Sequence, residues 1–186
     1  YDSRDIGKQE YDYAMCAINC GIEMEIVRLF PSNRTKGYFG TRRFDRTGNV
    51  KNNRIHMVSA SGFLETSHRI PNLDYDILMQ LTLKITKSME ECEKLYRLMC
   101  FNVYAHNRDD HSKNFTYLYD ENEIRWKLSP AYDLTYSNSL GGEHATTVNG
   151  NGVNPQLEDI LAVAKRSGLN MSMAKRIALD TKDCVN

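Results

Sequence analysis

The sequence predicts a mainly α-helical fold with two small β-hairpins, contained in one domain. The chain has 186 residues, a length that suits a single domain of ordinary size. Its content of 41% apolar and 26% charged residues is that of a folded globular chain. Apolar residues recur with helical spacing in several segments, and short strand-like runs stand in pairs with turn residues between them. Helices should therefore dominate, with hairpins between them.

The first helix is predicted near the start of the chain. Tyr11, Ala14 and Ile18 recur at spacings of three and four residues, so they share one helical face. Gly21 then stands where a C-terminal cap is expected.

A hairpin should follow this helix. Residues 23–26 alternate polar and apolar, which is the period of a strand. Residues 31–37 are rich in turn formers, and a second short strand is predicted to begin at Tyr38. Residues 45–53 contain a glycine and three asparagines, so we expect a loop there.

Two helices are predicted after Pro71. The first has an apolar face made of Ile77, Leu78, Leu81 and Ile85. Ser88 and Glu91 have the spacing of a capping box, which predicts the start of the second. The apolar face of that second helix includes Leu95, Leu98, Met99 and Val103. It should end near His106.

The last third of the chain predicts another hairpin, a long loop and two helices. Residues 115–119 and 124–128 form the hairpin strands, with a turn at 120–122. Residues 129–155 are rich in glycine and asparagine without periodicity, and long loops of this kind are usually functional or disordered. Asn154 and Pro155 suit the N-cap and first position of the next helix.

That helix should bury a stripe of apolar residues and end at Gly168. The stripe consists of Leu157, Ile160, Leu161 and Ala164. A last helix is predicted from about Met171 to Leu179.

Several classes of protein are excluded or disfavoured by composition. A formal net charge of +0 gives no broad basic field, so we expect no direct nucleic-acid binding. No apolar run approaches the ~18 residues of a membrane span, and the polar opening residues predict no signal peptide. The odd count of five cysteines, without C-x2-C spacing, indicates a reducing, cytoplasmic location.

Residues 106–114 are dense in groups that bind protons, metals or phosphates. Asp109 and Asn114 have the D-x4-N spacing of a kinase catalytic loop, in which the carboxylate accepts a hydroxyl proton and the amide oxygen helps to hold Mg²⁺. His111 or Lys113 could neutralise phosphate charge. Such loops are also common simple turns. A third interpretation is a transition-metal phosphohydrolase that uses His106, Asp109 and His111.

Asp133 forms the second candidate position. It follows the second hairpin, where phosphotransferases place a carboxylate that binds Mg²⁺. Together with Asn114 it would supply the one or two protein ligands that Mg²⁺ takes. Taken alone, Asp133 would also suit an N-cap or a surface charge. Likewise, the run from Arg42 to Arg46 would suit an ion-paired strand end.

Three segments match a known family. Residues 109–115, Asp-Asp-His-Ser-Lys-Asn-Phe, resemble the D-x-H-x-K-N-F loop of HipA-type kinases. Residues 130–133, Pro-Ala-Tyr-Asp, resemble the P-x-Y-D metal-binding segment of that family, and residues 43–46 resemble its R-F-D-R hinge. The order is that of the family, and the resemblance covers about residues 10–178.

The resemblance implies a serine/threonine protein kinase with a protein-kinase-like C-terminal lobe. Such kinases use ATP and Mg²⁺ and are often the toxins of toxin–antitoxin pairs. A DNA-binding antitoxin is then the implied partner, and a tRNA synthetase is a known kind of protein substrate.

The resemblance also implies roles for individual residues. Asp109 would be the catalytic base, and Asn114 and Asp133 would hold Mg²⁺. Lys113 would act in catalysis and, with His111, would line the nucleotide phosphates. The segment Arg42, Arg43 and Phe44 would lie beside adenine, and Tyr132 would also contact the nucleotide. Glu10 could pair with a phosphate-binding lysine.

The chain departs from the family pattern near its start. It has no G-x-G-x-x-G, and its only early lysine, Lys8, comes just before a helix. We therefore expect residues 1–186 to be one catalytic lobe, a fragment without the upstream phosphate-binding loop and lysine, with weak ATP binding alone. The alternative is a non-catalytic kinase-like module that docks an antitoxin or a protein substrate.

Overall fold

The fold is described from a computed structural model. It describes residues 5–48, 53–65, 73–138 and 141–186. Three parts of the sequence predictions lie outside the described residues: Pro71, residues 49–52 of the first predicted loop, and residues 139–140 of the second.

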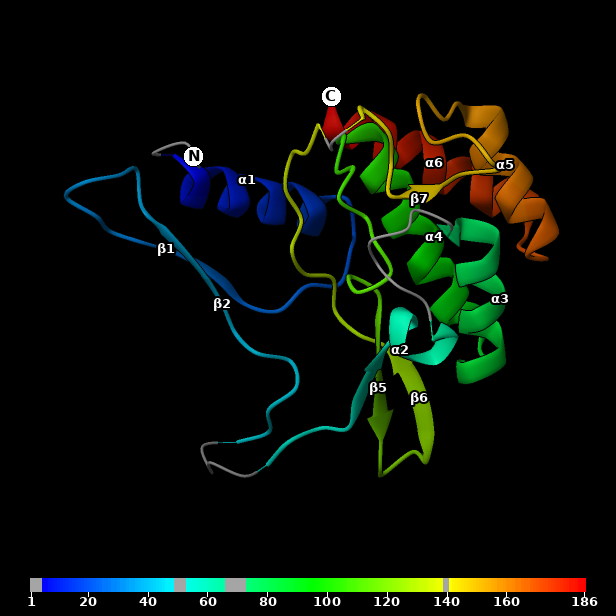
Figure 1. The fold of residues 1–186 in the computed structure, drawn as a ribbon, viewed down its shortest axis with the longest axis horizontal. Coiled ribbons are helices and arrows are strands. Elements are labelled where there is room, and N and C mark those ends of the chain that lie inside the picture. Colours follow the sequence, from blue (N-terminus) through cyan, green and yellow to red (C-terminus); the bar gives the residue numbers. More distant parts are fainter. Residues whose placement is uncertain (1–4, 49–52, 66–72, 139–140) are drawn as a thin grey trace.

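A helical bundle holds most of the hydrophobic core (Figure 1). It consists of α3 (Tyr75–Thr86), α4 (Met89–Tyr104), α5 (Leu157–Arg166) and α6 (Met171–Val185). Helix α4 is central, since it packs on both α3 and α6. Its Leu95, Tyr96, Met99, Cys100 and Phe101 are fully buried. The predicted existence of these helices is confirmed.

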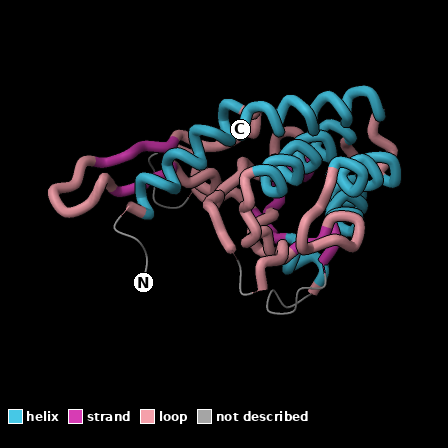
Figure 2. Tube along the Cα trace, turned by 90° about the horizontal axis from the view of Figure 1, so that it is seen from above, coloured by secondary structure: helices cyan, strands magenta, loops and turns pink. Residues whose placement is uncertain are grey.

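The first helix and the first hairpin lie to one side of this bundle (Figures 1 and 2). Helix α1 (Ile6–Asn19) packs against β1 (Val27–Phe30) and β2 (Tyr38–Thr41), which pair antiparallel. The hairpin is confirmed, but its first strand was wrongly predicted at residues 23–26. Met24 instead bridges Ala131, so tertiary contacts override the local alternation there.

The second hairpin is part of a larger antiparallel sheet with the order β3-β5-β6. The predicted strands are confirmed as β5 (Thr116–Asp120) and β6 (Arg125–Leu128). Strand β3 (Met57–Ser59) adds to β5, and the short helix α2 (Ala60–Leu64) follows it directly. Neither β3 nor α2 was predicted, because both are too short to show a period.

A parallel pair of strands corrects the predicted fold class further. Strand β4 (Leu73–Asp74) pairs with β7 (Thr146–Thr147), which lies inside the predicted long loop. The fold is therefore mixed α/β, with helices and small sheets: the predicted helices and the two hairpins are confirmed, and the further short strands were not predicted. The short strands went unnoticed because long-range pairing, and not local propensity, creates them.

Helix ends show where local signals were correct and where they failed. Gly21 and Gly168 have φ of +77° and +75°, as predicted for glycines after a helix. The Ser88 hydroxyl accepts the Glu91 N–H at 3.4 Å, but the Glu91 carboxylate binds elsewhere, so the predicted box is only half formed. The cap of α5 is Gln156, not Asn154, because the Asp159 carboxylate accepts the Gln156 N–H at 2.9 Å.

Two helix lengths also differ from prediction. Helix α4 ends at Tyr104, and His106 has a positive φ of 54° that no helix can accommodate. Helix α6 continues beyond Leu179 to Val185, because Thr181 is still buried one turn later.

Candidate active site

The segment that joins α4 to β5, residues 106–114, is here called the Asp109 loop. Its backbone is held at both ends: the Asn107 N–H donates to the Asn102 carbonyl at 2.9 Å, and the Ser112 carbonyl accepts the Ser61 N–H at 3.1 Å. The Ala60 N–H donates to the Phe115 carbonyl at 2.7 Å, just after the loop. A polar loop with this many backbone bonds has a fixed shape, which suits the positioning of side chains.

The buried side chain of Asp110 anchors the Asp109 loop to the rest of the fold. Only 1% of this residue is exposed, and its carboxylate accepts hydrogen bonds from Tyr75 at 2.9 Å and from the Thr146 N–H at 3.1 Å. The His144 Nδ1 lies 3.1 Å from the same carboxylate. Asn102 donates to the Tyr75 hydroxyl at 2.9 Å, which ties α3 and α4 into this network. Asp110 belongs to the motif of residues 109–115, but nothing local in the sequence shows that it meets His144.

Within the loop, the side chain of Asn114 contacts the backbone of Asp109. The Asn114 amide N–H donates to the Asp109 carbonyl oxygen at 2.8 Å, which leaves the amide oxygen of Asn114 to face another group. The Asp109 carboxylate is 55% exposed, and the His111 Nε2 lies 3.8 Å from it. Burial raises the pKa of Asp109; His111 lowers that pKa, and the charges of Asp133 and Asp110 raise it again. Asp109 and Asp133 are therefore electrostatic neighbours.

The Tyr132 side chain joins the Asp133 segment to the Asp109 loop. Its hydroxyl donates to the Lys113 carbonyl at 2.6 Å and lies 2.7 Å from the Thr116 hydroxyl. Asp133 itself is exposed and has a φ of +58°, a left-handed conformation that is uncommon outside glycine. Such conformations persist where the surrounding structure holds them, often at functional sites.

The predicted hinge, residues 43–46, contacts the Tyr132 side chain. The ring of Phe44 lies against that of Tyr132, with centroids 5.3 Å apart. Asp45 is buried and binds Arg43 through two hydrogen bonds of 2.7 Å, while Arg46 Nη1 donates to it at 2.7 Å. The Arg43 hydrogen bond is the largest cause that holds the pKa of Asp45 below its usual value. The ion-paired interpretation of this segment is thus correct as far as Asp45 is concerned.

A cavity of about 290 Å³ lies between the hinge and the Tyr132 segment. Four predicted nucleotide contacts line it together: Arg42, Arg43, Phe44 and Tyr132. Glu25, Thr41 and Met57 also line it, although the sequence offers no signal that Met57 should meet Tyr132. Asp109, His111, Lys113, Asn114 and Asp133 are not among its lining residues. Lys113 has an exposed side chain, and Glu10 lies half-buried on α1.

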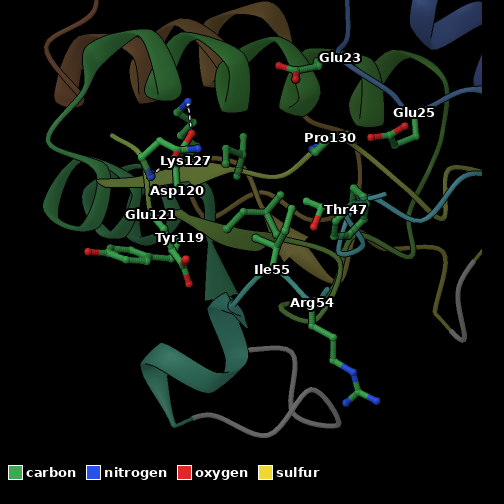
Figure 3. A pocket seen from close by; sticks show the side chains of 14 residues that line it. Glu23, Glu25, Thr47, Arg54, Ile55, Tyr119, Asp120, Glu121, Lys127 and Pro130 are labelled. Atoms are coloured by element: carbon green, nitrogen blue, oxygen red, sulfur yellow. Dashed lines mark hydrogen bonds and ion pairs between the residues drawn. The ribbon is translucent and has the colours of Figure 1, made fainter. Parts of the chain in front are cut away.

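A larger cavity of about 510 Å³ shares Glu25 and Phe44 with the first. Figure 3 shows Glu23 and Glu25 at one end and the Lys127–Asp120 pair at the other. Its lining carries charges of both signs, which does not indicate one class of ligand.

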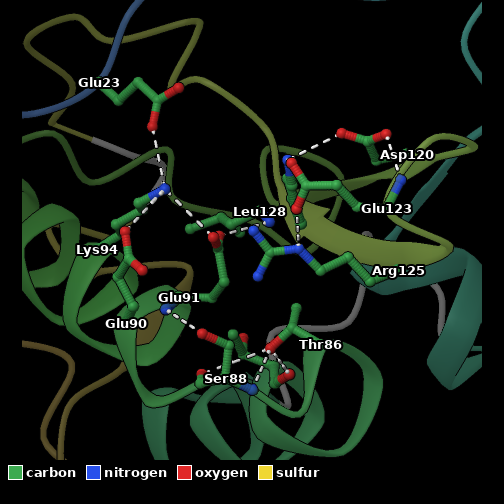
Figure 4. Close-up of polar contacts among 12 residues, drawn as sticks. Glu23, Thr86, Ser88, Glu90, Glu91, Lys94, Asp120, Glu123, Arg125 and Leu128 are labelled. Carbon is green, nitrogen blue, oxygen red and sulfur yellow. Dashed lines mark hydrogen bonds and ion pairs between the residues drawn. The ribbon is translucent and has the colours of Figure 1, made fainter.

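A polar cluster fixes β6, which leads into the Asp133 segment. The buried Glu91 carboxylate of α4 accepts the Leu128 N–H at 2.8 Å, and Lys94 donates to it at 3.2 Å (Figure 4). Lys94 also lies 3.3 Å from Glu23. Helix α4 therefore positions both the segment after α1 and the strand before Asp133.

The transition-metal interpretation gains no support. Within the described ranges, no group of three or more His, Cys, Asp or Glu residues is placed to hold a metal ion. His106 instead lines a separate cavity, so it does not join Asp109 and His111 in a metal site.

Comparison with known proteins decides the family. The profile of the HipA-like C-terminal domain matches residues 2–186. The chain belongs to the HipA-like C-terminal domain family. The resemblance inferred from the sequence motifs is thereby confirmed.

Solved structures share the fold of this HipA-like domain. One is a chain of the Shewanella oneidensis MR-1 toxin–antitoxin complex of HipA, HipB and operator DNA, with a TM-score of 0.75 and 16% identity over 96% of this chain. Another is the Helicobacter pylori proinflammatory kinase CtkA, with a TM-score of 0.59 and 11% identity over 96% of this chain.

The HipA-like domain spans 47% of the Shewanella chain and 81% of CtkA, so it is about half the length of the first. No match is found among curated proteins. In the described part of the chain, no helix is long and apolar enough to cross a membrane.

Proposed function

We propose that this chain is the catalytic lobe of an ATP- and Mg²⁺-dependent serine/threonine protein kinase of the HipA type. The single observation that carries this proposal is the junction of the Asp109 loop with the Asp133 segment through Tyr132. It ties the loop that carries the candidate base Asp109 and the candidate ligand Asn114 to the segment that carries the candidate ligand Asp133, about 20 residues later in the chain. The kinase-like fold of the solved structures supports the same conclusion.

The residues fit a divalent cation. With its N–H bound to the Asp109 carbonyl, Asn114 has its amide oxygen as the remaining polar atom, and an amide oxygen is a ligand that Mg²⁺ accepts. Asp133 supplies an exposed carboxylate close enough to Asp109 to raise its pKa. Neighbouring carboxylates repel each other, and a cation between them removes that cost. When bound, Mg²⁺ would neutralise phosphate charge.

Each side chain has a defined task in this proposal. Asp109 accepts the proton of a substrate serine or threonine hydroxyl, and its raised pKa makes it a better base than an ordinary aspartate. Lys113 and His111 face the phosphates and stabilise their charge. Phe44 packs on adenine beside Arg42 and Arg43, and Tyr132 holds the two segments together while it contacts the nucleotide.

Partners are proposed on the same basis. The Shewanella neighbour comes from a complex with HipB and operator DNA. We infer a DNA-binding antitoxin as the partner of this chain too, and a protein substrate such as a tRNA synthetase. The alternative is a kinase-like module that only docks such partners.

Phosphotransfer by the full-length natural protein separates these functions. Asp109→Asn should lower phosphate transfer from radiolabelled ATP to a protein serine or threonine by about 10²–10⁴-fold, because the base is lost. Asp180→Asn, on an exposed position of α6, is the matched control and should leave transfer unchanged. Transfer that survives Asp109→Asn would contradict the kinase proposal. If neither the natural protein nor Asp109→Asn transfers phosphate, and the cellular effect is the same for both, the docking module would be favoured.

A further inference from the structure

A polar cavity of about 390 Å³ lies beside the residues that precede Asp109. The end of α4, the start of α5 and the end of α6 surround it, and His106, Arg108 and His144 line it from the loops. None of the residues assigned to the proposed kinase chemistry lines this cavity. Its volume falls in the range of small-ligand sites, ~300–1,000 Å³.

Arg108 is the most unusual group in the wall. Its side chain is half-buried, and its Nε atom is buried without a hydrogen-bond partner among the residues that the structure describes. A guanidinium cannot lose its charge in a protein, so burial of an N–H without an acceptor is costly. The Nε itself is out of reach of solvent, so a ligand in the cavity would meet the terminal nitrogens of the guanidinium, and a bound anion would offset the cost of burying part of this charge.

The remaining charges agree with an anion. Lys182, from the last turn of α6, and His106 also line the cavity, whereas Glu158 is its one carboxylate among the lining residues. The nearby Asp110 carboxylate is occupied by Tyr75, Thr146 and His144, so it belongs to the network beneath the Asp109 loop. Helix α5 begins at the wall, but Glu158 and Asp159 of its first turn already balance the positive end of that helix, so the positive charge at the cavity comes from Arg108, Lys182 and His106.

The pKa of His106 is lowered in this cavity. Burial is the largest cause of this lowered pKa, and the positive charges of Arg108 and His144 add to it. A bound anion would reverse that effect and raise the pKa of His106.

We propose that this cavity binds a phosphate group, as free phosphate or as the phosphate monoester of a phosphorylated residue. Arg108 and Lys182 hold the phosphate oxygens, and His106 adds charge when protonated. The volume leaves room for the group that carries the phosphate. This site does not depend on the proposed kinase activity. Because Arg108 directly precedes Asp109, occupation would bear on the Asp109 loop.

Binding of phosphate to the full-length protein tests the proposal. Inorganic phosphate and O-phosphoserine are titrated separately by calorimetry, in buffer with a chelator that removes Mg²⁺. Both Arg108→Gln and Lys182→Gln should weaken binding by about tenfold or more, the loss expected for one charge-assisted hydrogen bond. Stronger binding of O-phosphoserine than of inorganic phosphate would assign the site to a phosphorylated residue, and the reverse would assign it to free phosphate.

Two controls keep the test decisive. Lys175→Gln removes an exposed lysine of α6 that does not line the cavity, and it should leave the affinity unchanged. Lys113→Gln removes the lysine proposed for the nucleotide phosphates. Binding that depends on Lys113 but not on Arg108 or Lys182, or no binding at all by the natural protein, would overturn the proposal. Lys182→Gln decides the matter if Arg108→Gln does not fold, as judged by circular dichroism.

Discussion

Individual buried charges decide the shape of the candidate site. The Asp110 side chain has hydrogen-bond partners from α3, from β7 and from the loop that contains His144. A buried carboxylate is tolerated because its partners replace the water that it lost. At the hinge, the buried Asp45 carboxylate is stabilised by Arg43 and Arg46 in place of water.

Asp110→Ala should be strongly destabilising. It leaves the Tyr75 hydroxyl, the Thr146 N–H and His144 without their acceptor in a buried place, at a cost of about 3–5 kcal/mol. Urea denaturation followed by circular dichroism measures this loss. The exposed Asp180→Ala should change stability by less than about 0.5 kcal/mol. Equal effects of the two variants would show that the network contributes nothing.

Asp45→Asn should make stability less dependent on pH. Because the folded pKa of Asp45 is lowered, its contribution is fully present above the unfolded value of about 3.9 and is lost as the pH falls through the folded pKa. The variant should be less stable at pH 7 by about 1 kcal/mol, since Arg43 is 67% exposed and solvent screens the pair. Denaturation at pH 7 and at about pH 3 measures the gap, which should shrink in acid. A constant gap would argue against the ion pair.

At the scale of elements, α4 organises the site. Near the C-terminal end of α4, Asn102 holds the Asp109 loop. Near the N-terminal end of α4, Glu91 fixes β6 (Figure 4). The sequence predicted this helix, its apolar face and its Ser88 cap. It assigned Glu91 to the cap, but the carboxylate instead satisfies a strand N–H 37 residues away, which only packing brings near.

Glu91→Gln and Glu91→Ala should lower the free energy of unfolding by different amounts. Glutamine keeps an acceptor for the Leu128 N–H and should cost about 1 kcal/mol, whereas alanine leaves that buried donor unpaired and should cost about 2–3 kcal/mol. Glu90→Ala, an exposed neighbour on the same helix, serves as the control and should be nearly neutral. Measured unfolding free energies that rank the glutamine variant below alanine would contradict this assignment.

At the scale of the whole molecule, the share of a relative's length that this chain covers matters most. It spans 47% of the Shewanella HipA chain, so a test of the 186-residue chain alone examines about half of the length of that relative. The phosphate contacts proposed within this chain are His111 and Lys113. The cytoplasmic location stays a prediction.

The isolated chain should bind Mg·ATP only weakly. Because the sequence contains no G-x-G-x-x-G motif, we expect a dissociation constant in the range of about 1 mM, which corresponds to roughly −4 kcal/mol. Calorimetric titration of the 186-residue chain with Mg·ATP measures it. Micromolar affinity would show that the described residues form a complete nucleotide site.

The sequence by itself determined the family, the helices with clear periods and the two hairpins. Those features depend on neighbours three to seven residues apart or on short motifs, and such signals survive in one dimension. The D-x4-N spacing belongs to this class, because one loop holds both Asp109 and Asn114. Short strands such as β3, β4 and β7 had no such signal, since each is created by a partner far away in the chain.

Only the tertiary structure decided what surrounds those motifs. It joined Tyr132 to Lys113, buried Asp110 against His144, and left the Arg108 Nε without an acceptor at a cavity wall. The physical reason is that burial and the distance between charges are properties of three dimensions. A residue type states which bonds a side chain can make, and packing decides which of them it does make.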